Sequence, residues 1–317
     1  MTFGFVFPGQ GSQAVGMLAA LASPAHDEPP IRDTFAEASA VLGYDLWQLV
    51  AQGPAERLNS TECTQPAMLA ASIATLRLWR GRGGPEPAVV CGHSLGEFSA
   101  LVAADALDFA AAIELVRFRG RVMQEAVPAG MGAMAAILGL DDAQVIEACR
   151  EAAQGGVVEA VNFNAPGQVV IAGAREPVER TIEAAKRRGA KRAVALPVSV
   201  PSHSSLMSSA AQRLGERLES VNLRTPRIRF VSAVDASAHE DPADLRRLLV
   251  RQLSSPVRWS QTVRALAAGG IRTFIECGPG KVLSALNRRI ERGLESLALE
   301  DADSLQGALA AAQAGTT

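Results

Sequence analysis

The order of apolar and polar segments along the chain predicts an α/β protein. Short apolar runs at residues 3–7 and 88–91 predict buried strands, and each is followed by a glycine-containing turn. Residues 66–80 repeat apolar side chains at helical spacing, and Asp108 stands where the N-cap of another helix, ending near Glu125, is expected. Strands that alternate with helices in this way favour a mostly parallel sheet.

The pattern changes between Pro128 and Ser199. Strand, helix, two strands, helix and strand follow one another, and the two central strands meet at the turn "APG". This β-α-β-β-α-β order is typical of a ferredoxin-like unit. We therefore expect a small ferredoxin-like subdomain at 128–199, inserted in a larger α/β body made of residues 1–127 and 200–317.

The last third of the chain returns to the α/β pattern. We expect a helix from about Ser202, a strand near residues 228–231, two helices, a strand at 272–277 and a helix from Gly280. The alanine-rich segment 305–317 predicts a final helix with a frayed end.

Composition narrows the class of protein. Of 317 residues, 48% are hydrophobic and 4% aromatic, and the formal net charge is −2, which argues against a nucleic-acid-binding surface. The four cysteines include no CxxC pair, so we expect free thiols in a reducing compartment. No basic leader and no apolar stretch of about 20 residues is present, and we expect a cytoplasmic protein without membrane contact.

The glycine-rich start "FPGQGSQAVG" invites comparison with a nucleotide-binding loop. Gly9 and Gly11 fit the dinucleotide motif G-x-G-x-x-G, but its third position is Ala14. The segment around Gly280 lacks the first glycine of a phosphate-binding Walker loop. Nucleotide binding is therefore disfavoured, and the glycines indicate that another group approaches the backbone near Gln10.

The segment "GHSLG" has the form G-x-S-x-G between a predicted strand and a predicted helix, the context of a nucleophile elbow. The flanking glycines allow a tight turn that presents the hydroxyl of Ser94. The first N–H groups of the next helix, beginning with Leu95, then point toward an oxyanion formed on an acyl group. An ordinary turn with a capping serine is the alternative. Neighbours in an elbow point apart, so we expect His93 to pack or to bond locally.

Ser94 requires a base, and the pattern favours His203. This histidine follows a predicted strand and comes 109 residues after Ser94, in the serine-then-histidine order of α/β hydrolases. His26 and His239 lie in polar loops, and a capping or core role is the alternative for His203. No suitably placed acid lies between the serine and the histidine, so we expect a neutral group such as a carbonyl to orient the imidazole.

One arginine of the helix that follows Asp108 faces the apolar side. At about 100° per residue, Arg119 falls with Val116 and Met123, whereas Arg117 and Arg121 fall on the opposite side. A buried guanidinium has to be paired. A structural ion pair and a site for a ligand carboxylate both satisfy this requirement.

Taken together, several motifs resemble the malonyl-CoA:acyl carrier protein transacylases of bacterial fatty-acid synthesis. They are "FVFPGQGSQ", "GHSLGE", "FRGRVMQEAVP", "VNFNAPGQVVIAG", "PVSVPSHSSLM", "VRQL" and "ECGPGKVL", in family order from Phe3 to about Arg289. The resemblance implies that Ser94 is acylated, that His203 is its base, and that Leu95 and Gln10 supply backbone N–H groups to an oxyanion hole. It also implies that Arg119 binds the free carboxylate of malonate.

The resemblance further implies an α/β-hydrolase-like larger subdomain and a role for two more residues. Gln252 is expected to orient His203 through a carbonyl oxygen, and Asn162 to lie near the substrate. The chain has Ser232 and Ala233 where the family often has asparagine. The implied substrates are malonyl-CoA and a holo acyl carrier protein, with neither metal nor cofactor, and we expect a monomer.

Three alternatives stay open at this stage. A free-standing malonyl acyltransferase of polyketide synthesis carries much the same motifs. A serine esterase or thioesterase shares Ser94 and His203 but gives Arg119 no task. A non-enzymatic docking module for carrier proteins requires none of these groups to react.

Overall fold

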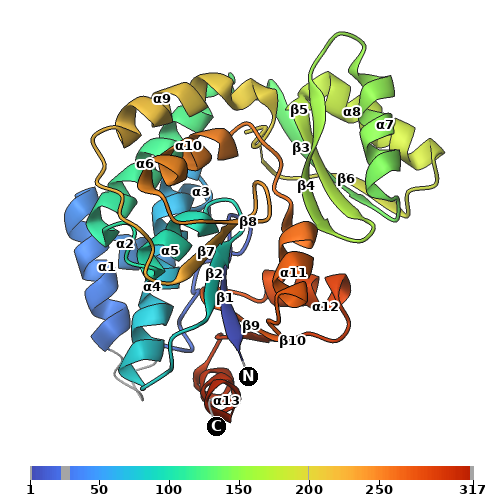
Figure 1. Cartoon of the computed structure of the whole chain (residues 1–317). Helices are drawn as coiled ribbons and strands as arrows, with labels where there is room; N and C mark the ends of the chain where they lie inside the picture. Colours follow the sequence, from blue (N-terminus) through green and yellow to red (C-terminus); the bar gives the residue numbers. More distant parts are fainter. Residues whose placement is uncertain (1, 23–28, 199, 315–317) are drawn as a thin grey trace.

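Two β-sheets organise the chain, as Figure 1 shows for the computed structural model, which describes residues 2–22, 29–198 and 200–314. His26 and the expected frayed end at 315–317 lie outside the described residues. The larger sheet contains, in spatial order, β10 (Glu295–Ala298), β9 (Thr273–Glu276), β1 (Phe3–Phe7), β2 (Val89–Gly92), β7 (Arg229–Ser232) and β8 (Ser237–His239). The first five of these strands are parallel, and β8 pairs antiparallel with β7.

Strand β1 lies in the middle of this sheet and is buried on both faces. Phe3, Phe5 and Phe7 join the core on one face, whereas Val6 joins a second core on the other. Double burial explains why the sequence shows a continuous apolar run here rather than an alternating one. On the first face, the ring of Trp79 packs edge-on against Phe5, with centroids 5.3 Å apart.

Helices cover both faces of the large sheet (Figure 1). Helices α11 and α12 contribute to the second core and the other large-subdomain helices to the first, with α13 at the edge near both termini. Their bounds are α1 (Pro29–Leu42), α2 (Leu46–Gln52), α3 (Ala55–Leu58), α4 (Thr61–Gly81), α5 (Gly96–Ala103), α6 (Phe109–Ala126), α9 (Ser208–Leu218), α10 (Pro242–Gln252), α11 (Trp259–Ala268), α12 (Val282–Ile290) and α13 (Ala302–Ala314).

Helix α4 begins earlier than its apolar pattern predicted. The helix starts at Thr61 and includes Pro66, although a proline at this position removes one helical hydrogen bond. Close packing of α4 against α6 compensates for the lost hydrogen bond. The two helices approach closely at Gly120, where a Cβ would lie 2.5 Å from the carbonyl oxygen of Thr61. The prediction for α6 is confirmed, since Asp108 caps the N–H of Ala111 at 3.1 Å.

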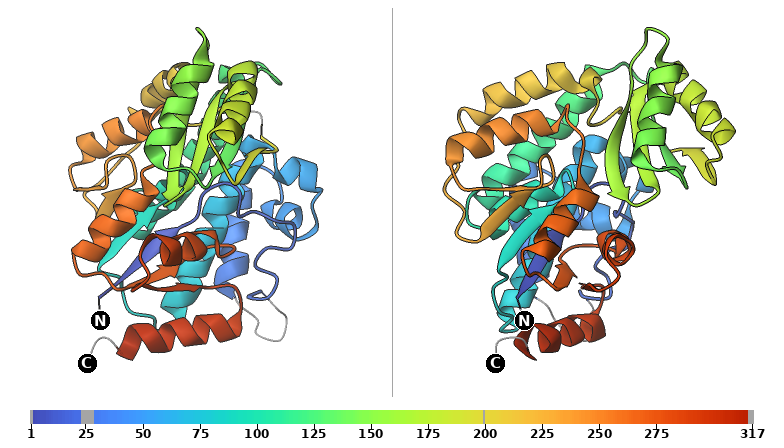
Figure 2. Two further views of the ribbon diagram at one scale, coloured as in Figure 1. Left: turned by 90° about the vertical axis from the view of Figure 1, so that its right-hand side faces the viewer. Right: turned by 45° about the vertical axis from the view of Figure 1, so that its right-hand side comes forward.

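The second sheet is small and antiparallel, with the strand order β4 (Val158–Ala165), β5 (Gln168–Ala174), β3 (Gly132–Leu138) and β6 (Arg192–Ala195). Helices α7 (Asp142–Ala153) and α8 (Arg175–Arg187) pack on one face around a core that includes Ile137 and Ile171. Figure 2 shows this unit projecting from the larger body. The predicted α/β fold with a ferredoxin-like unit is confirmed.

Irregular backbone precedes α9, where a helix from Ser202 was predicted. Only a 3-10 turn, η1 (Ser205–Met207), comes before α9. The reason lies in His203, whose φ of +67° is incompatible with a right-handed helix. The helical prediction is therefore wrong over Ser202–Ser204.

Strand topology brings two loops of interest together. Because β1 and β2 are parallel neighbours, the loop after Phe7 and the turn after Gly92 emerge at the same edge of the sheet, where ligand sites of open α/β sheets form. The small sheet is attached nearby, since the N–H of Phe163 donates to Val257 at 2.9 Å and the N–H of Val257 donates to Val161 at 2.8 Å. No helix within the described ranges combines the length and the hydrophobicity that a membrane span requires.

Candidate active site

The turn between β2 and α5 holds Ser94 in a left-handed conformation, with φ of +53°. Non-glycine residues in this region cost about 1–3 kcal/mol, and such strain occurs mainly at functional sites. The two flanking glycines make the turn possible. A Cβ on Gly92 would lie 2.2 Å from the backbone nitrogen of Glu97, and one on Gly96 would lie 2.0 Å from the carbonyl oxygen of Phe7.

The imidazole of His203 contacts the serine directly. Its Nε2 lies 2.7 Å from Ser94 Oγ, and its Nδ1 lies 2.8 Å from the backbone carbonyl oxygen of Gln252. A carbonyl oxygen only accepts, so Nδ1 carries the proton and Nε2 is left to accept from the serine hydroxyl. The carbonyl group of Gln252 thus occupies the place where a serine triad has its carboxylate.

Burial keeps this imidazole neutral. Only 3% of His203 is exposed, and removal from water lowers its pKa to about 3, assisted by the positive charge of Arg119. The carbonyl of Gln252 opposes this shift. A neutral imidazole hydrogen-bonded to a hydroxyl is the arrangement that general-base activation of a serine requires.

The guanidinium of Arg119 lies beside the same hydroxyl. Arg119 is fully buried and donates to Gln65 Oε1 at 2.9 Å, to Gln252 Oε1 at 3.0 Å and to Ser94 Oγ at 3.3 Å. Its Nε has no partner among the described residues, and burial lowers its pKa to about 10, which leaves the group charged at neutral pH. The cation also lies 5.5 Å from the ring centre of Phe98.

The other arginines of α6 behave as their helical positions predicted. Arg117 forms a half-exposed ion pair with Glu62 at 3.1 Å, and Arg121 lies 4.0 Å from Glu125. Of the three, Arg119 alone contacts the serine.

The loop after β1 lies against the elbow. A Cβ on Gly9 would lie 2.5 Å from the carbonyl oxygen of His93, so the backbone here approaches as closely as the sequence suggested. Gln10 follows, with an exposed side chain whose Oε1 accepts from Gln65 at 3.4 Å. Leu95 begins the turn into α5 and is buried. The loop that carries Gln10 therefore lies against the elbow that carries Ser94 and Leu95.

Asn162 is placed on β4 of the small sheet and is not brought into contact with the serine. Its Oδ1 is buried without a hydrogen-bond partner among the described residues. The neighbour two positions on, Asn164, reaches the elbow instead, with its Oδ1 2.9 Å from Nε2 of His93. His93 is thus hydrogen-bonded to a residue 71 positions away rather than locally, and its ring packs against that of Trp259, with ring centres 5.7 Å apart. Asn164 was not anticipated from the sequence.

Besides Asn164, two buried polar residues of the site were missed by sequence reasoning. Gln65 lies within the apolar face of α4, and Glu97 follows the elbow in the first turn of α5. The only sequence signal for Gln65 was a polar side chain among the apolar residues of a predicted helix. The only signal for Glu97 was its place directly after the elbow motif. Ser232 and Ala233, whose roles the sequence left open, both donate to Glu97 Oε1, at 2.7 Å each.

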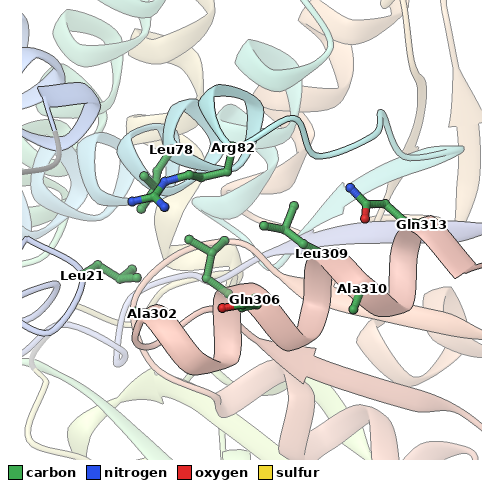
Figure 3. A pocket seen from close by; sticks show the side chains of 9 residues that line it. Leu21, Leu78, Arg82, Ala302, Gln306, Leu309, Ala310 and Gln313 are labelled. Carbon is green, nitrogen blue, oxygen red and sulfur yellow. The ribbon is translucent and has the colours of Figure 1, made fainter. Parts of the chain in front are cut away.

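His239 was assigned to a loop, but it ends strand β8, and its Nε2 lies 3.1 Å from Asp235. No cluster of three or more histidine, cysteine, aspartate or glutamate side chains that could hold a metal occurs within the described ranges. A pocket of about 420 Å³ lies elsewhere, between the end of α4 and α13 (Figure 3). Leu21, Leu78 and Leu309 are among its lining residues, which include none of the serine site.

Comparison with known proteins places this arrangement in context. The model of the acyl transferase domain family matches residues 4–313. The malonyl CoA-acyl carrier protein transacylase of Escherichia coli is 54% identical over 97% of this chain and 98% of its own length. The solved acyl carrier protein S-malonyltransferase of Vibrio cholerae has a TM-score of 0.94 and 54% identity, covering 97% of this chain and 100% of that one.

A third comparison is with a malonyl-transacylase solved in complex with the holo acyl-carrier protein of a type II polyketide synthase. Its TM-score is 0.96 and its identity 52%, over 98% of this chain and 100% of that chain.

Proposed function

We propose a serine-based acyl-transfer mechanism for this chain, which belongs to the acyl transferase family and, within it, to the malonyl-CoA–acyl carrier protein transacylases. The chain is accordingly a malonyl-CoA:acyl carrier protein S-malonyltransferase of fatty-acid synthesis. The roles of its residues and the course of the reaction are proposed from the geometry.

In the first half-reaction, His203 Nε2 takes the proton of Ser94 as Oγ attacks the thioester carbonyl carbon of malonyl-CoA. The neutral state of His203 and its 2.7 Å contact with Oγ support this step. The carbon–sulfur bond then breaks, the proton passes from His203 to the leaving thiolate, and free CoA departs. A malonyl ester on Ser94 remains.

Charge that develops on the thioester oxygen is received by backbone N–H groups of Gln10 and Leu95. The close approach of Gly9 to His93 supports this assignment, because it fixes the first loop against the elbow. In a serine protease, removal of one such donor costs about 2.7–4 kcal/mol of transition-state stabilisation. Asn162, with its unpaired Oδ1 on the neighbouring sheet, is proposed to contact the substrate.

In the second half-reaction, the phosphopantetheine thiol of the carrier protein attacks the ester. His203 takes the thiol proton and returns a proton to Ser94 Oγ as the ester bond breaks. The malonyl group leaves as a thioester of the carrier, and the serine is regenerated. The acceptor is a thiol rather than water, which distinguishes this cycle from that of an esterase.

The observation that carries the choice of malonyl substrates is the position of Arg119. A fully buried guanidinium with an unpaired Nε lies 3.3 Å from the nucleophile, where it can bind the free carboxylate of a malonyl group. An esterase for neutral acyl groups has no use for such a cation.

The test is incubation with malonyl-CoA and a holo acyl carrier protein, followed by intact-mass analysis of both proteins. We expect a malonyl adduct on the enzyme, absent in Ser94→Ala, and malonyl-carrier as the product. Free malonate as the sole product would indicate a thioesterase. Carrier binding without an adduct would indicate a docking module. In parallel assays, we expect faster malonyl transfer to a fatty-acid carrier protein than to a polyketide carrier protein.

We further propose that the enzyme acts as a cytoplasmic monomer. The four cysteines are free, which supports a reducing compartment. The exposed large apolar side chains of the described residues come from separate elements, including Val15, Met131 and Val282, which supports the monomer. Light scattering on the purified protein tests the oligomeric state.

A further inference from the structure

A buried carboxylate lies next to the catalytic group without touching substrate-binding atoms. Glu97 is fully buried, and its Oε1 accepts from the hydroxyl of Ser232 and from the N–H of Ala233. Its Oε2 accepts from Nε2 of Gln252 at 2.5 Å. Every partner is a donor, so the contacts favour the charged form, although burial raises the pKa of Glu97 to about 7.

The amide of Gln252 stands between this carboxylate and Arg119. Its Nε2 faces Glu97, and its Oε1 accepts from Arg119 at 3.0 Å. The orientation of the amide is therefore fixed. A flipped amide would place its NH2 group against the donor Arg119 and its oxygen against the acceptor Glu97. Among the described residues, Arg119 donates to Gln65, Ser94 and Gln252, none of which is a carboxylate.

A buried cation and a buried anion are thus separated by one neutral side chain. Burying Arg119 without compensating charge would be costly, and Glu97 is a negative group close enough to raise its pKa. A direct bidentate pair between Arg119 and Glu97, however, would occupy the guanidinium N–H groups that a malonyl carboxylate needs. With the amide of Gln252 between them, Glu97 still compensates the positive charge of Arg119, and the guanidinium N–H groups stay available for the substrate carboxylate.

We propose that Glu97 and the side chain of Gln252 are positioning residues for substrate selection: the amide of Gln252 keeps the carboxylate of Glu97 off Arg119, so that Arg119 binds the carboxylate of the acyl substrate. This inference rests on the proposed function. It assigns the Gln252 side chain a task distinct from that of its backbone carbonyl, which holds His203.

The experiment exchanges the two side chains. In the double variant Glu97→Gln/Gln252→Glu, the buried net charge and the number of non-hydrogen atoms are retained, and the amide oxygen of residue 97 can still accept from Ser232 and Ala233. The carboxylate now lies directly against Arg119. We expect kcat/KM with malonyl-CoA to fall at least about tenfold more than kcat/KM with acetyl-CoA, mainly through a higher KM for malonyl-CoA. Both activities also fall, because Gln252 Nε2 donates to the carbonyl oxygen of Ser94 in the native protein.

Glu97→Gln alone is the matched control. In this variant the amide NH2 groups of residues 97 and 252 face each other, and no carboxylate lies against Arg119. We therefore expect kcat/KM to fall for both malonyl-CoA and acetyl-CoA, with the ratio of the two values unchanged. The exchange restores a donor–acceptor pair, and we expect the double variant to unfold at a higher temperature than Glu97→Gln.

Three results would overturn the proposal: a double variant that keeps the native malonyl-to-acetyl ratio, a ratio that falls equally in Glu97→Gln, or a double variant no more stable than Glu97→Gln. If the wild-type enzyme forms malonyl-carrier but the double variant keeps the native malonyl-to-acetyl ratio, only this inference is refuted. Wild-type enzyme that forms no malonyl-carrier refutes the proposed function and this inference with it.

Discussion

His203 and Ser94 face each other across a 2.7 Å contact between Nε2 and Oγ, although they are 109 positions apart in the sequence. Two anchors from the end of α10 hold the histidine in place: its Nδ1 bonds the carbonyl of Gln252, and its backbone N–H donates to Leu253 at 3.0 Å. Both residues of the pair adopt positive φ, +53° for Ser94 and +67° for His203. The surrounding fold therefore imposes a strained but aligned pair.

The pH dependence of acylation should reflect the buried state of His203. Burial lowers the pKa of His203 from its ordinary 6.5 to about 3 in the free enzyme. A lowered pKa keeps the imidazole neutral as pH falls, and the base is lost only when pH falls through the shifted value. We expect the rate of Ser94 malonylation, measured in single turnovers, to show no midpoint attributable to His203 between pH 6 and pH 7. An acid limb centred at the ordinary histidine value, with the same midpoint for malonyl-CoA and acetyl-CoA, would show a solvated imidazole.

Substrate selection should depend on Arg119. Arg119→Ala removes the charge-assisted bonds that we propose for the malonyl carboxylate. We therefore expect malonyl transfer to fall about 100-fold more than acetyl transfer, since two such bonds contribute roughly 3 kcal/mol. The measurement is kcat/KM with malonyl-CoA and acetyl-CoA. Arg117→Ala is the matched control, because Arg117 lies on the same helix but pairs with Glu62 at the surface. Equal losses on both substrates would make Arg119 purely structural.

The residues that sequence reasoning located share a local signature. Ser94 lies between glycines after a strand, and Arg119 occupies an apolar helix face. His203 was found by its place after a strand, although its neighbourhood was wrongly assigned to a helix. In each case the signal lies within about ten residues of the side chain, so a single sequence suffices to detect it.

The residues that sequence reasoning missed are defined by distant partners. Glu97 looks like an ordinary acid in the first turn of a helix, and its carboxylate is buried with a hydrogen bond from Ser232, 135 positions away. Gln65 meets Arg119 across 54 positions. Strand β10, with the sequence "ESLA", was missed because it has no β-branched residue and becomes a strand only by pairing with β9.

The loop carrying Gln10 offers a test that spares the side chains of the site. In Gly9→Ala the added Cβ would lie 2.5 Å from the carbonyl oxygen of His93, so the loop has to move away from the elbow. We expect acylation to slow by up to about 100-fold, equally for malonyl-CoA and acetyl-CoA, because the proposed oxyanion donor of Gln10 is displaced. Gly307→Ala is the control, since that glycine lies in α13 with open space around it. A substrate-selective effect of Gly9→Ala would instead place the loop near the malonyl carboxylate.

Glu276 supports the fold apart from the catalytic group. It ends β9, is fully buried, and accepts from the N–H groups of Leu283 at 3.1 Å and Ser284 at 2.7 Å at the start of α12. Glu276→Ala leaves both donors unpaired, and we expect the free energy of unfolding to fall by about 2–4 kcal/mol. Urea denaturation measures the loss. A change below about 0.5 kcal/mol would show that water replaces the carboxylate.

The same carboxylate should make stability depend on pH in a defined direction. Burial raises the pKa of Glu276 from 4.5 to about 7, against the opposing hydrogen bonds from Leu283 and Ser284. Between these values the folded protein binds more protons than the unfolded chain, so the contribution of Glu276 to stability falls as pH rises. Glu276→Gln cannot titrate, and its stability relative to wild type should therefore increase from about pH 5 to pH 7 and level off above. The difference cancels the titration of Glu97, which is present in both proteins. A pH-independent difference would mean that the two backbone donors hold Glu276 ionised throughout, and that α12 begins on a permanent buried charge.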